Sequence, residues 1–137
     1  MSEPVCVAGA FRFPAWLRIR RRRDFEQILG RGARSSDERL KVWVSHNGLE
    51  VSRLGLIVGR RFGNAVRRNR AKRILREAFR LSRADLPAGL DILCSPRAGV
   101  ELELQKCMRS LQKITRRLAR RLASSRPVGE TPENATA

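Results

Sequence analysis

Residues 60–80 read RRFGNAVRRNRAKRILREAFR, and this stretch decides how the rest of the chain can be arranged. At ~100° per residue, six apolar residues of a helix over positions 65–82 fall on one arc about 160° wide. They are Ala71, Ile74, Leu75, Ala78, Phe79 and Leu81. Asn64 precedes this segment and is a typical N-cap residue. We therefore predict a helix from Asn64 to about Ser82 with that arc as its buried face.

The opposite arc of this helix is cationic. It carries Asn69, Lys72, Arg73, Arg76 and Arg80, with Arg67, Arg68 and Arg70 nearer the amino-terminal end and Glu77 as the only acid. Like charges four residues apart destabilise an isolated helix by ~0.2–0.5 kcal/mol per pair, a cost that a folded protein tolerates more readily when phosphates lie opposite. Guanidinium groups suit bidentate phosphate contacts and stacking on unpaired bases. Free backbone N–H groups at the helix start also attract anions.

The composition of the whole chain points to the same kind of partner. A chain of 137 residues is long enough for one domain, and 30 Lys+Arg against 13 Asp+Glu give a net charge of +17. Nucleic acid is the leading partner, and an anionic membrane surface is the competitor. Because no apolar run approaches the ~20 residues of a spanning helix, and Glu3 argues against a signal peptide, we expect a cytoplasmic protein without membrane contact.

Further elements are predicted on both sides of this helix. Apolar spacing favours a short helix over 24–29, β-branched residues favour a strand over 40–44, and Asn47-Gly48 predicts a hairpin turn to an antiparallel strand over 51–58. A strand over 90–94 and an amphipathic helix over 101–123 follow. This order indicates an α/β or α+β layer of helices on a small sheet. We expect one domain over 18–123, with flexible segments at 1–17 and 124–137.

The run from Gly63 to Arg73 matches the pattern Gly-Asn-Ala-Val-x-Arg-Asn-Arg-x-Lys-Arg at every fixed position. It resembles the signature of the bacterial ribonuclease P protein component, and the similarity extends from Arg18-Ile19 through about residue 118. The resemblance implies an α+β sandwich in which a small mixed sheet packs with three helices. It also implies a left-handed βαβ crossover through the arginine helix, where periodicity alone would predict the usual right-handed connection.

Members of this family are the protein subunit of an endoribonuclease that removes the 5′ leader from precursor tRNA. The resemblance implies that the RNA subunit holds the catalytic Mg²⁺, so that the protein chain itself needs no cofactor. It places contacts to the RNA subunit at Arg60, Arg61, Asn64, Arg67, Arg68, Asn69, Arg70, Lys72, Arg73 and Arg76. It places leader contacts in a cleft at Phe25, Leu29 and Trp43, where the family often has three aromatic residues and Leu29 departs from that pattern.

No residue of the chain is predicted to be catalytic. His46 is the only histidine and has no clustered partner, and Glu101 and Glu103 stand where they favour the dipole of the last helix. The three cysteines contain no Cys-x-x-Cys pair and are interpreted as reduced thiols. Trp43 shares a strand face with Lys41 and Ser45, so base stacking and core packing both stay open for it, as they do for Phe25.

Three other classes of protein fit the sequence less well. A ribosome-associated or chaperone-like RNA-binding protein would share the charge, but it would have no reason to carry the motif. A helix-turn-helix DNA-binding module would need a second helix just before the arginine helix, where the sequence predicts a strand. A self-sufficient nuclease would need a cluster of metal ligands that the sequence lacks.

Overall fold

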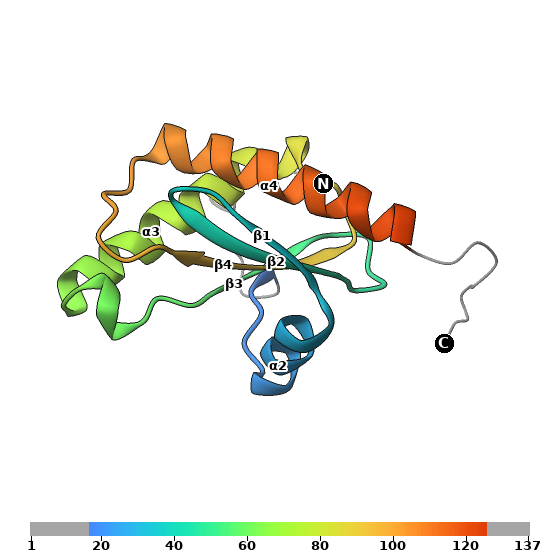
Figure 1. Cartoon of the computed structure of the whole chain (residues 1–137), viewed down its shortest axis with the longest axis horizontal. Coiled ribbons are helices and arrows are strands. Elements are labelled where there is room, and N and C mark those ends of the chain that lie inside the picture. The colour runs from blue at the N-terminus through green and yellow to red at the C-terminus, as the bar shows by residue number, and fades with distance from the viewer. Residues whose placement is uncertain (1–16, 126–137) are drawn as a thin grey trace, which may run out of the picture.

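Four strands form one mixed sheet in the order β1-β2-β4-β3. The computed structural model describes residues 17–125, and the strands are β1 (Ala33–Ser36), β2 (Leu40–His46), β3 (Arg53–Leu56) and β4 (Leu90–Pro96). Helices α3 (Ala65–Ser82) and α4 (Leu104–Ser125) cover one face of this sheet, and α2 (Arg22–Arg31) lies against the other (Figure 1). Two short 3₁₀ helices, η2 (Arg60–Phe62) and η3 (Arg83–Asp85), flank α3. The predicted α+β fold is therefore confirmed.

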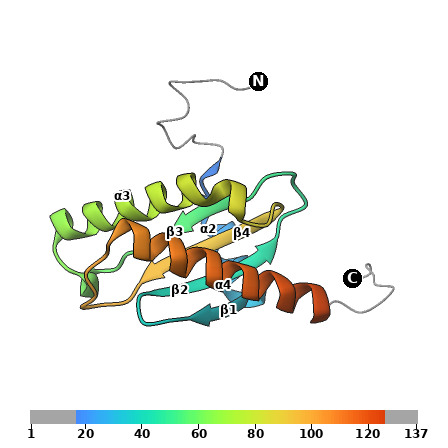
Figure 2. The same cartoon turned by 90° about the horizontal axis from the view of Figure 1, so that it is seen from above.

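The crossover that the resemblance implied is present. β3 and β4 are adjacent and parallel, and α3 connects them, whereas β2 is antiparallel to both β1 and β4. Seen from the side of the helices, the chain passes from β3 through α3 into β4 in the left-handed sense (Figure 2). This arrangement places the amino-terminal end of α3 beside the end of the sheet where β3 and β4 finish.

The predicted antiparallel pairing of residues 40–44 with residues 51–58 is wrong. The turn itself exists, since Gly48 has φ 72° and the Asn47 side chain accepts a hydrogen bond of 2.7 Å from the Leu49 N–H. However, β4 lies between β2 and β3, and the Asn47 amide donates to Asp91 of β4 at 3.0 Å. Residues 90–94 are all buried, and a strand covered on both faces takes the centre of a sheet rather than its edge.

Strand β1 was not predicted, because Ala-Arg-Ser-Ser carries no apolar alternation. Its four residues pair with β2 and lie beneath α4, so tertiary contacts hold a segment that has weak strand propensity of its own. The last helix begins at Leu104 rather than at residue 101. Glu101 and Glu103 therefore precede it, and the Glu103 carbonyl accepts the first hydrogen bond, from Cys107 N at 2.9 Å.

The larger core lies between the sheet and the two helices α3 and α4. On α3 the structure buries Ala71, Leu75, Ala78 and Phe79 as predicted, and Ile74 is half-buried. Leu81 was assigned to the buried arc but is 42% exposed, because it lies at the margin of that arc. Ser82, which lies near the middle of the arc, is fully buried instead, and its hydroxyl accepts a hydrogen bond of 3.0 Å from Gln112 on α4.

A smaller cluster lies on the other face of the sheet, beneath α2. Ile19, Ile28 and Leu93 are buried there, and Phe25, Trp43 and Ile57 pack against them half-buried. The helix predicted over 24–29 is confirmed as α2. This face of the sheet is only partly covered, which leaves room for a ligand beside α2.

The segments predicted to be flexible, 1–17 and 124–137, lie outside the described residues apart from their inner ends. Leu17 is buried, and residues 124–125 complete α4. Within residues 17–125, no helix is both long and apolar enough to cross a lipid bilayer.

Candidate RNA-binding surfaces

The Gly-Asn pair of the motif sets the start of α3. The Asn64 side chain accepts a hydrogen bond of 2.9 Å from the backbone N–H of Arg67, which confirms the predicted N-cap. Gly63 has φ 152° and ψ −167°, a conformation that only glycine adopts readily. A Cβ at Gly63 would lie 2.8 Å from Cδ of Arg67. The Arg67 guanidinium lies 5.8 Å from the centre of the Phe62 ring, so the motif also directs this cation.

The structure divides the predicted RNA-subunit residues of α3 by their exposure. Asn69, Arg70 and Arg73 are exposed along the outer side of the helix. Arg68, Lys72 and Arg76 are half-buried, on the side of α3 that turns toward β3. The cations therefore extend from the outer side of α3 down to the edge of the sheet.

Four cations surround a pocket at that edge. Lys72 and Arg76 line a pocket of about 200 Å³ together with Arg18 and Arg20, the backbone of β3, and Phe25. A parallel bridge between Arg18 and Leu54 brings the early segment to this position. No acidic side chain lines the pocket. Burial, and after it the charge of Arg18, lower the pKa of the Arg76 guanidinium, and an arginine still remains charged at neutral pH. The pocket is suited to an anion such as a phosphate.

Arg18 and Arg20 were not among the predicted site residues. The run of arginines at 18–23 was a visible signal, but its place beside α3 depends on the bridge to β3. Arg68 adds a further polar group close to this edge. Its Nε is buried and has no hydrogen-bond partner within the described part of the chain. A buried donor without an acceptor destabilises the protein.

The predicted leader cleft lies on the opposite face of the sheet. Phe25 and Trp43 are brought together in the small cluster beneath α2, and both are half-buried. Gly55 makes the close packing possible, since a Cβ there would lie 2.6 Å from Cδ2 of Leu93 and 3.1 Å from Cζ of Phe25. Leu29 lies one turn beyond Phe25 on α2, is 44% exposed, and takes no part in the cluster.

The face assigned to Trp43 is confirmed. Val42 and Val44 are fully buried in the larger core, whereas Trp43 lies on the other face and borders a hollow lined by Arg34, Ser35, Ser36 and Lys41. The indole thus has packed and open sides at once. It can contribute to the core and still offer a surface for a base.

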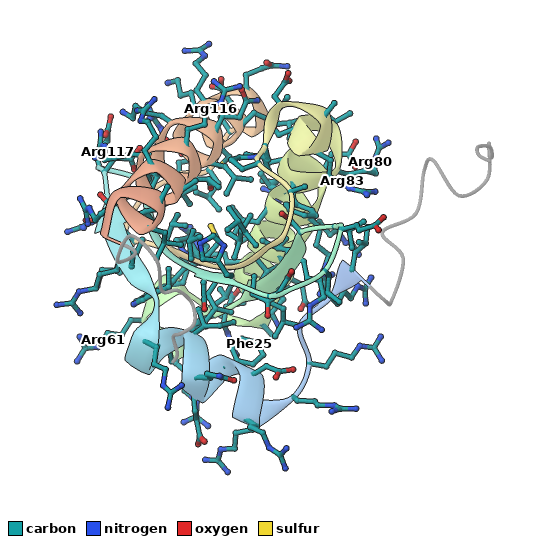
Figure 3. The ribbon with its side chains drawn as sticks, turned by 90° about the vertical axis from the view of Figure 1, so that its right-hand side faces the viewer. Phe25, Arg61, Arg80, Arg83, Arg116 and Arg117 are labelled. Atoms are coloured by element: carbon teal, nitrogen blue, oxygen red, sulfur yellow. The ribbon has the colours of Figure 1, made fainter. Side chains whose placement is uncertain are left out.

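Arg60 and Arg61 lie apart from the cationic side of α3. They line a groove at the end of the sheet together with Lys41, Ile57 and Ser95, with Arg97 beside them. Lys41, Ile57 and Ser95 belong to the sheet face that carries Trp43, and Figure 3 shows Arg61 and Phe25 on the α2 side of the sheet. The structure therefore joins the Arg60-Arg61 pair to the cleft rather than to the helix that follows it.

The chain offers few donors for metal chemistry. Within residues 17–125, no three His, Cys, Asp or Glu side chains come close enough to hold a metal ion. Cys94 and Cys107 are buried free thiols, and burial raises the pKa of both. Oxygen ligands suited to Mg²⁺ are thus not gathered in the described domain, and we derive no catalytic step from its side chains.

A basic α+β domain with cations along one helix, and with aromatic residues in a basic cleft on the far side of its sheet, belongs to the class of RNA-binding proteins. Residues 13–119 match the family Ribonuclease P. The chain therefore belongs to the family of the bacterial ribonuclease P protein component, as the motif predicted. Members of that family are the protein component of the ribonuclease P endoribonuclease, which acts in tRNA processing.

Relatives and solved structures agree with this assignment. The chain is 44% identical over 89 residues to the ribonuclease P protein component of Thermotoga petrophila, covering 65% of this chain and 76% of the relative. It is 39% identical over 125 residues to that of Desulfovibrio desulfuricans, covering 87% and 95%. The fold matches the RNase P protein from Thermotoga maritima with a TM-score of 0.68 and 36% identity, over 73% of this chain and 96% of that one. The Staphylococcus aureus RNase P protein matches with a TM-score of 0.65 and 27% identity, over 73% and 93%.

Proposed function

We propose that this chain binds the RNA subunit of ribonuclease P through α3 and binds the 5′ leader of precursor tRNA in the cleft beside α2. In this way it assists removal of the leader to make the mature 5′ end. The RNA subunit supplies the Mg²⁺ chemistry of the holoenzyme, while this chain binds and orients RNA. The observation that carries the proposal is the acid-free pocket of Arg18, Arg20, Lys72 and Arg76, which continues the motif cations to the edge of the cleft.

Contact with the RNA subunit is assigned to the motif residues. They are Arg60, Arg61, Asn64, Arg67, Arg68, Asn69, Arg70, Lys72, Arg73 and Arg76. The exposed members can reach phosphates directly, and the half-buried Lys72 and Arg76 line the pocket in which Arg18 and Arg20 would also surround a bound anion. Arg60 and Arg61 also lie in the groove that continues the cleft, which supports a place for them where the two RNAs come close together.

The leader is assigned to Phe25, Trp43 and Leu29. Trp43 borders the hollow lined by Arg34 and Lys41, whereas Phe25 packs close to Gly55. Leu29 is exposed and offers an apolar contact in place of an aromatic ring. The surrounding cations Arg34, Lys41 and Arg61 suit a phosphate backbone that crosses the cleft while a base lies on the indole.

Reconstitution tests the function as a whole. We expect the purified protein to allow a bacterial ribonuclease P RNA to cleave precursor tRNA at Mg²⁺ concentrations where the RNA alone is inactive. No stimulation with the cognate RNA over a range of salt concentrations would show that the proposal is wrong.

The contact through α3 has its own test. Arg68→Ala with Arg73→Ala should weaken binding of the RNA subunit and lower the slope of log K against log salt by ~1 for each lost phosphate contact. Arg23→Ala with Arg83→Ala is the matched control, since both residues are exposed, lie outside α3 and change the charge equally. Equal slopes for the two double variants would place the contact elsewhere.

The cleft is tested with substrates that differ only in the leader. Trp43→Ala should reduce binding of leader-bearing precursor tRNA by ~1–3 kcal/mol if a base stacks on the indole, and it should leave leaderless tRNA unaffected. Leu49→Ala removes an exposed apolar side chain from the turn after β2 and serves as the control. A Trp43→Ala variant that loses the same affinity for both substrates would argue against a leader contact.

A further inference from the structure

Helix α4 carries a second set of cations that the motif does not include. Residues 104–125 contain Lys106, Arg109, Lys113, Arg116, Arg117, Arg120 and Arg121, and they contain no acid. All seven side chains are exposed. Like charges three or four residues apart destabilise a helix, and α4 contains several such pairs, among them Arg109 with Lys113 and Arg116 with Arg120. The core contacts of α4 do not require this pattern, since they use only its apolar face.

Four of these cations form a line along the middle of the solvent face. Arg109, Lys113, Arg116 and Arg120 follow one another at spacings of four and three residues. They lie opposite the buried face that carries Leu111 and Leu118. The line advances by one cation per helical turn of ~5.4 Å. Such a row can follow the backbone of one RNA strand, with the Arg109 and Arg120 guanidinium groups able to take a phosphate in bidentate fashion.

The positive charge of this face is largely uncompensated. Arg109 and Arg120 have no hydrogen bond or ion pair with any residue between 17 and 125. Lys113 approaches Asp37 only at 4.0 Å, as Lys106 approaches Glu103, and ion pairs at an exposed surface contribute little. The helix dipole favours cations only in the last turn, which is residues 122–125 here and holds none of the seven.

Hydrogen bonds to neutral groups hold two arginines of this face in place, Arg116 from the line and Arg117 beside it. Arg116 donates from Nε and Nη2 to the Asp85 carbonyl, at 3.2 and 2.9 Å, beside the end of α3. Arg117 donates to the Ser35 hydroxyl at 3.2 Å, on the β1 side. These acceptors orient the Arg116 and Arg117 guanidinium groups without neutralising them, so these two cations are held in place before an anion binds.

We propose that the outer face of α4 is a second phosphate-binding surface, which holds a segment of the ribonuclease P RNA subunit distinct from the segment bound by α3. This inference rests on the proposed function, because it takes the RNA subunit as the partner. α4 lies beside α3 on the same face of the sheet (Figure 2). Arg116 and Arg117 lie on the opposite side of the sheet from Phe25 (Figure 3). An RNA that contacts α3 can therefore extend onto α4 on the same face of the sheet, whereas a leader held in the cleft lies on the opposite face.

Salt-dependent binding of the RNA subunit, without precursor tRNA, tests the proposal. Arg109→Gln, Lys113→Gln and Arg120→Gln together remove three cations that make no hydrogen bond within the described domain. Three lost phosphate contacts should lower the slope of log K against log salt by about 2.1–2.7. When the salt concentration rises from 50 to 200 mM, the affinity of the variant for the RNA subunit should then fall by a factor about 20–40 times smaller than that of the wild type. The charge-matched control replaces three exposed arginines at α2, on the far side of the sheet, by glutamine: Arg21, Arg23 and Arg31.

Hydroxyl-radical footprinting of the same complexes identifies the occupant. We expect the α4 variant to lose protection of one RNA-subunit segment, and Arg68→Ala with Arg73→Ala to lose protection of another. Equal slopes for the α4 and α2 variants, or unchanged footprints, would overturn the inference, as would protection that moves to precursor tRNA when it is added. A motif variant that binds normally would instead count against the proposed function, so the two failures are distinguishable.

Discussion

Gly63→Ala is the sharpest test of how the motif builds the RNA-binding helix. Gly63 has φ 152° and ψ −167°, a region in which other residues are strained by ~1–3 kcal/mol. The new Cβ would also lie 2.8 Å from Cδ and from Nε of Arg67, which displaces that side chain from the Phe62 ring. Loss of an exposed cation–π contact adds ~0.5–1 kcal/mol. We expect the free energy of unfolding to fall by about 1.5–4 kcal/mol.

Thermal melting followed by circular dichroism measures this change. At roughly 4 °C per kcal/mol for a domain of this size, the Tm should fall by about 6–16 °C. Gly30→Ala is the matched control, because Gly30 lies within α2 and a Cβ there would meet no atom within 4 Å. That change should raise stability by ~0.4–1 kcal/mol. A Gly63→Ala protein that melts with the wild type or with the control would refute the strain argument.

Three further outcomes follow from buried groups. Asp91→Asn should lower the free energy of unfolding in urea by about 2–4 kcal/mol because it breaks the nearly buried pair with Arg53 at 2.7 Å, whereas Glu26→Gln in an exposed pair should change it by less than ~1 kcal/mol. Burial alone raises the pKa of Asp37, but the nearby Ser110 hydroxyl, hydrogen bonds from the Leu40 and Arg39 backbone N–H groups and the charge of Lys113 hold it below the ordinary value. The Asp37 carboxylate therefore stabilises the protein above pH ~4, and this stabilisation is lost as the pH falls through the lowered pKa. In urea titrations at several pH values, the free energy of unfolding of Asp37→Ala should therefore fall less steeply below pH ~4 than that of the wild type. Cys94, whose pKa burial raises, should resist thiol reagents at pH 8 in a folded Cys6→Ser background and react once the protein is unfolded.

Helices α3 and α4 could be predicted from the sequence, because their cap residue and apolar spacing are local signals. Asn64 as an N-cap, the apolar arc of α3 and the spacing in α4 each depend on neighbours within one or two turns, and the structure has all three. The face of Trp43 followed from simple alternation along β2. Local periodicity misplaced Leu81, which lies at the margin of the arc and is 42% exposed.

The strand order did not follow from local signals. Asn47-Gly48 forms the predicted turn, yet it does not produce a hairpin, because β4 enters between the strands on either side. The competition among strands for partners involves residues more than thirty positions apart, as in the pairing of Leu54 with Ile92. The left-handed sense of the crossover came from the family resemblance, since the general rule favours the opposite hand.

The candidate sites divide in the same way. By itself the sequence indicated a polyanionic partner, through the net charge, and determined the family, through the eleven residues from Gly63 to Arg73. Tertiary structure decided which cations lie near one another: it brought Arg18 to Arg76, placed Arg61 on the side of Phe25, and set α4 beside α3. The physical reason is that charge and motif are properties of the residues themselves, whereas a binding surface depends on long-range contacts that bring distant residues together.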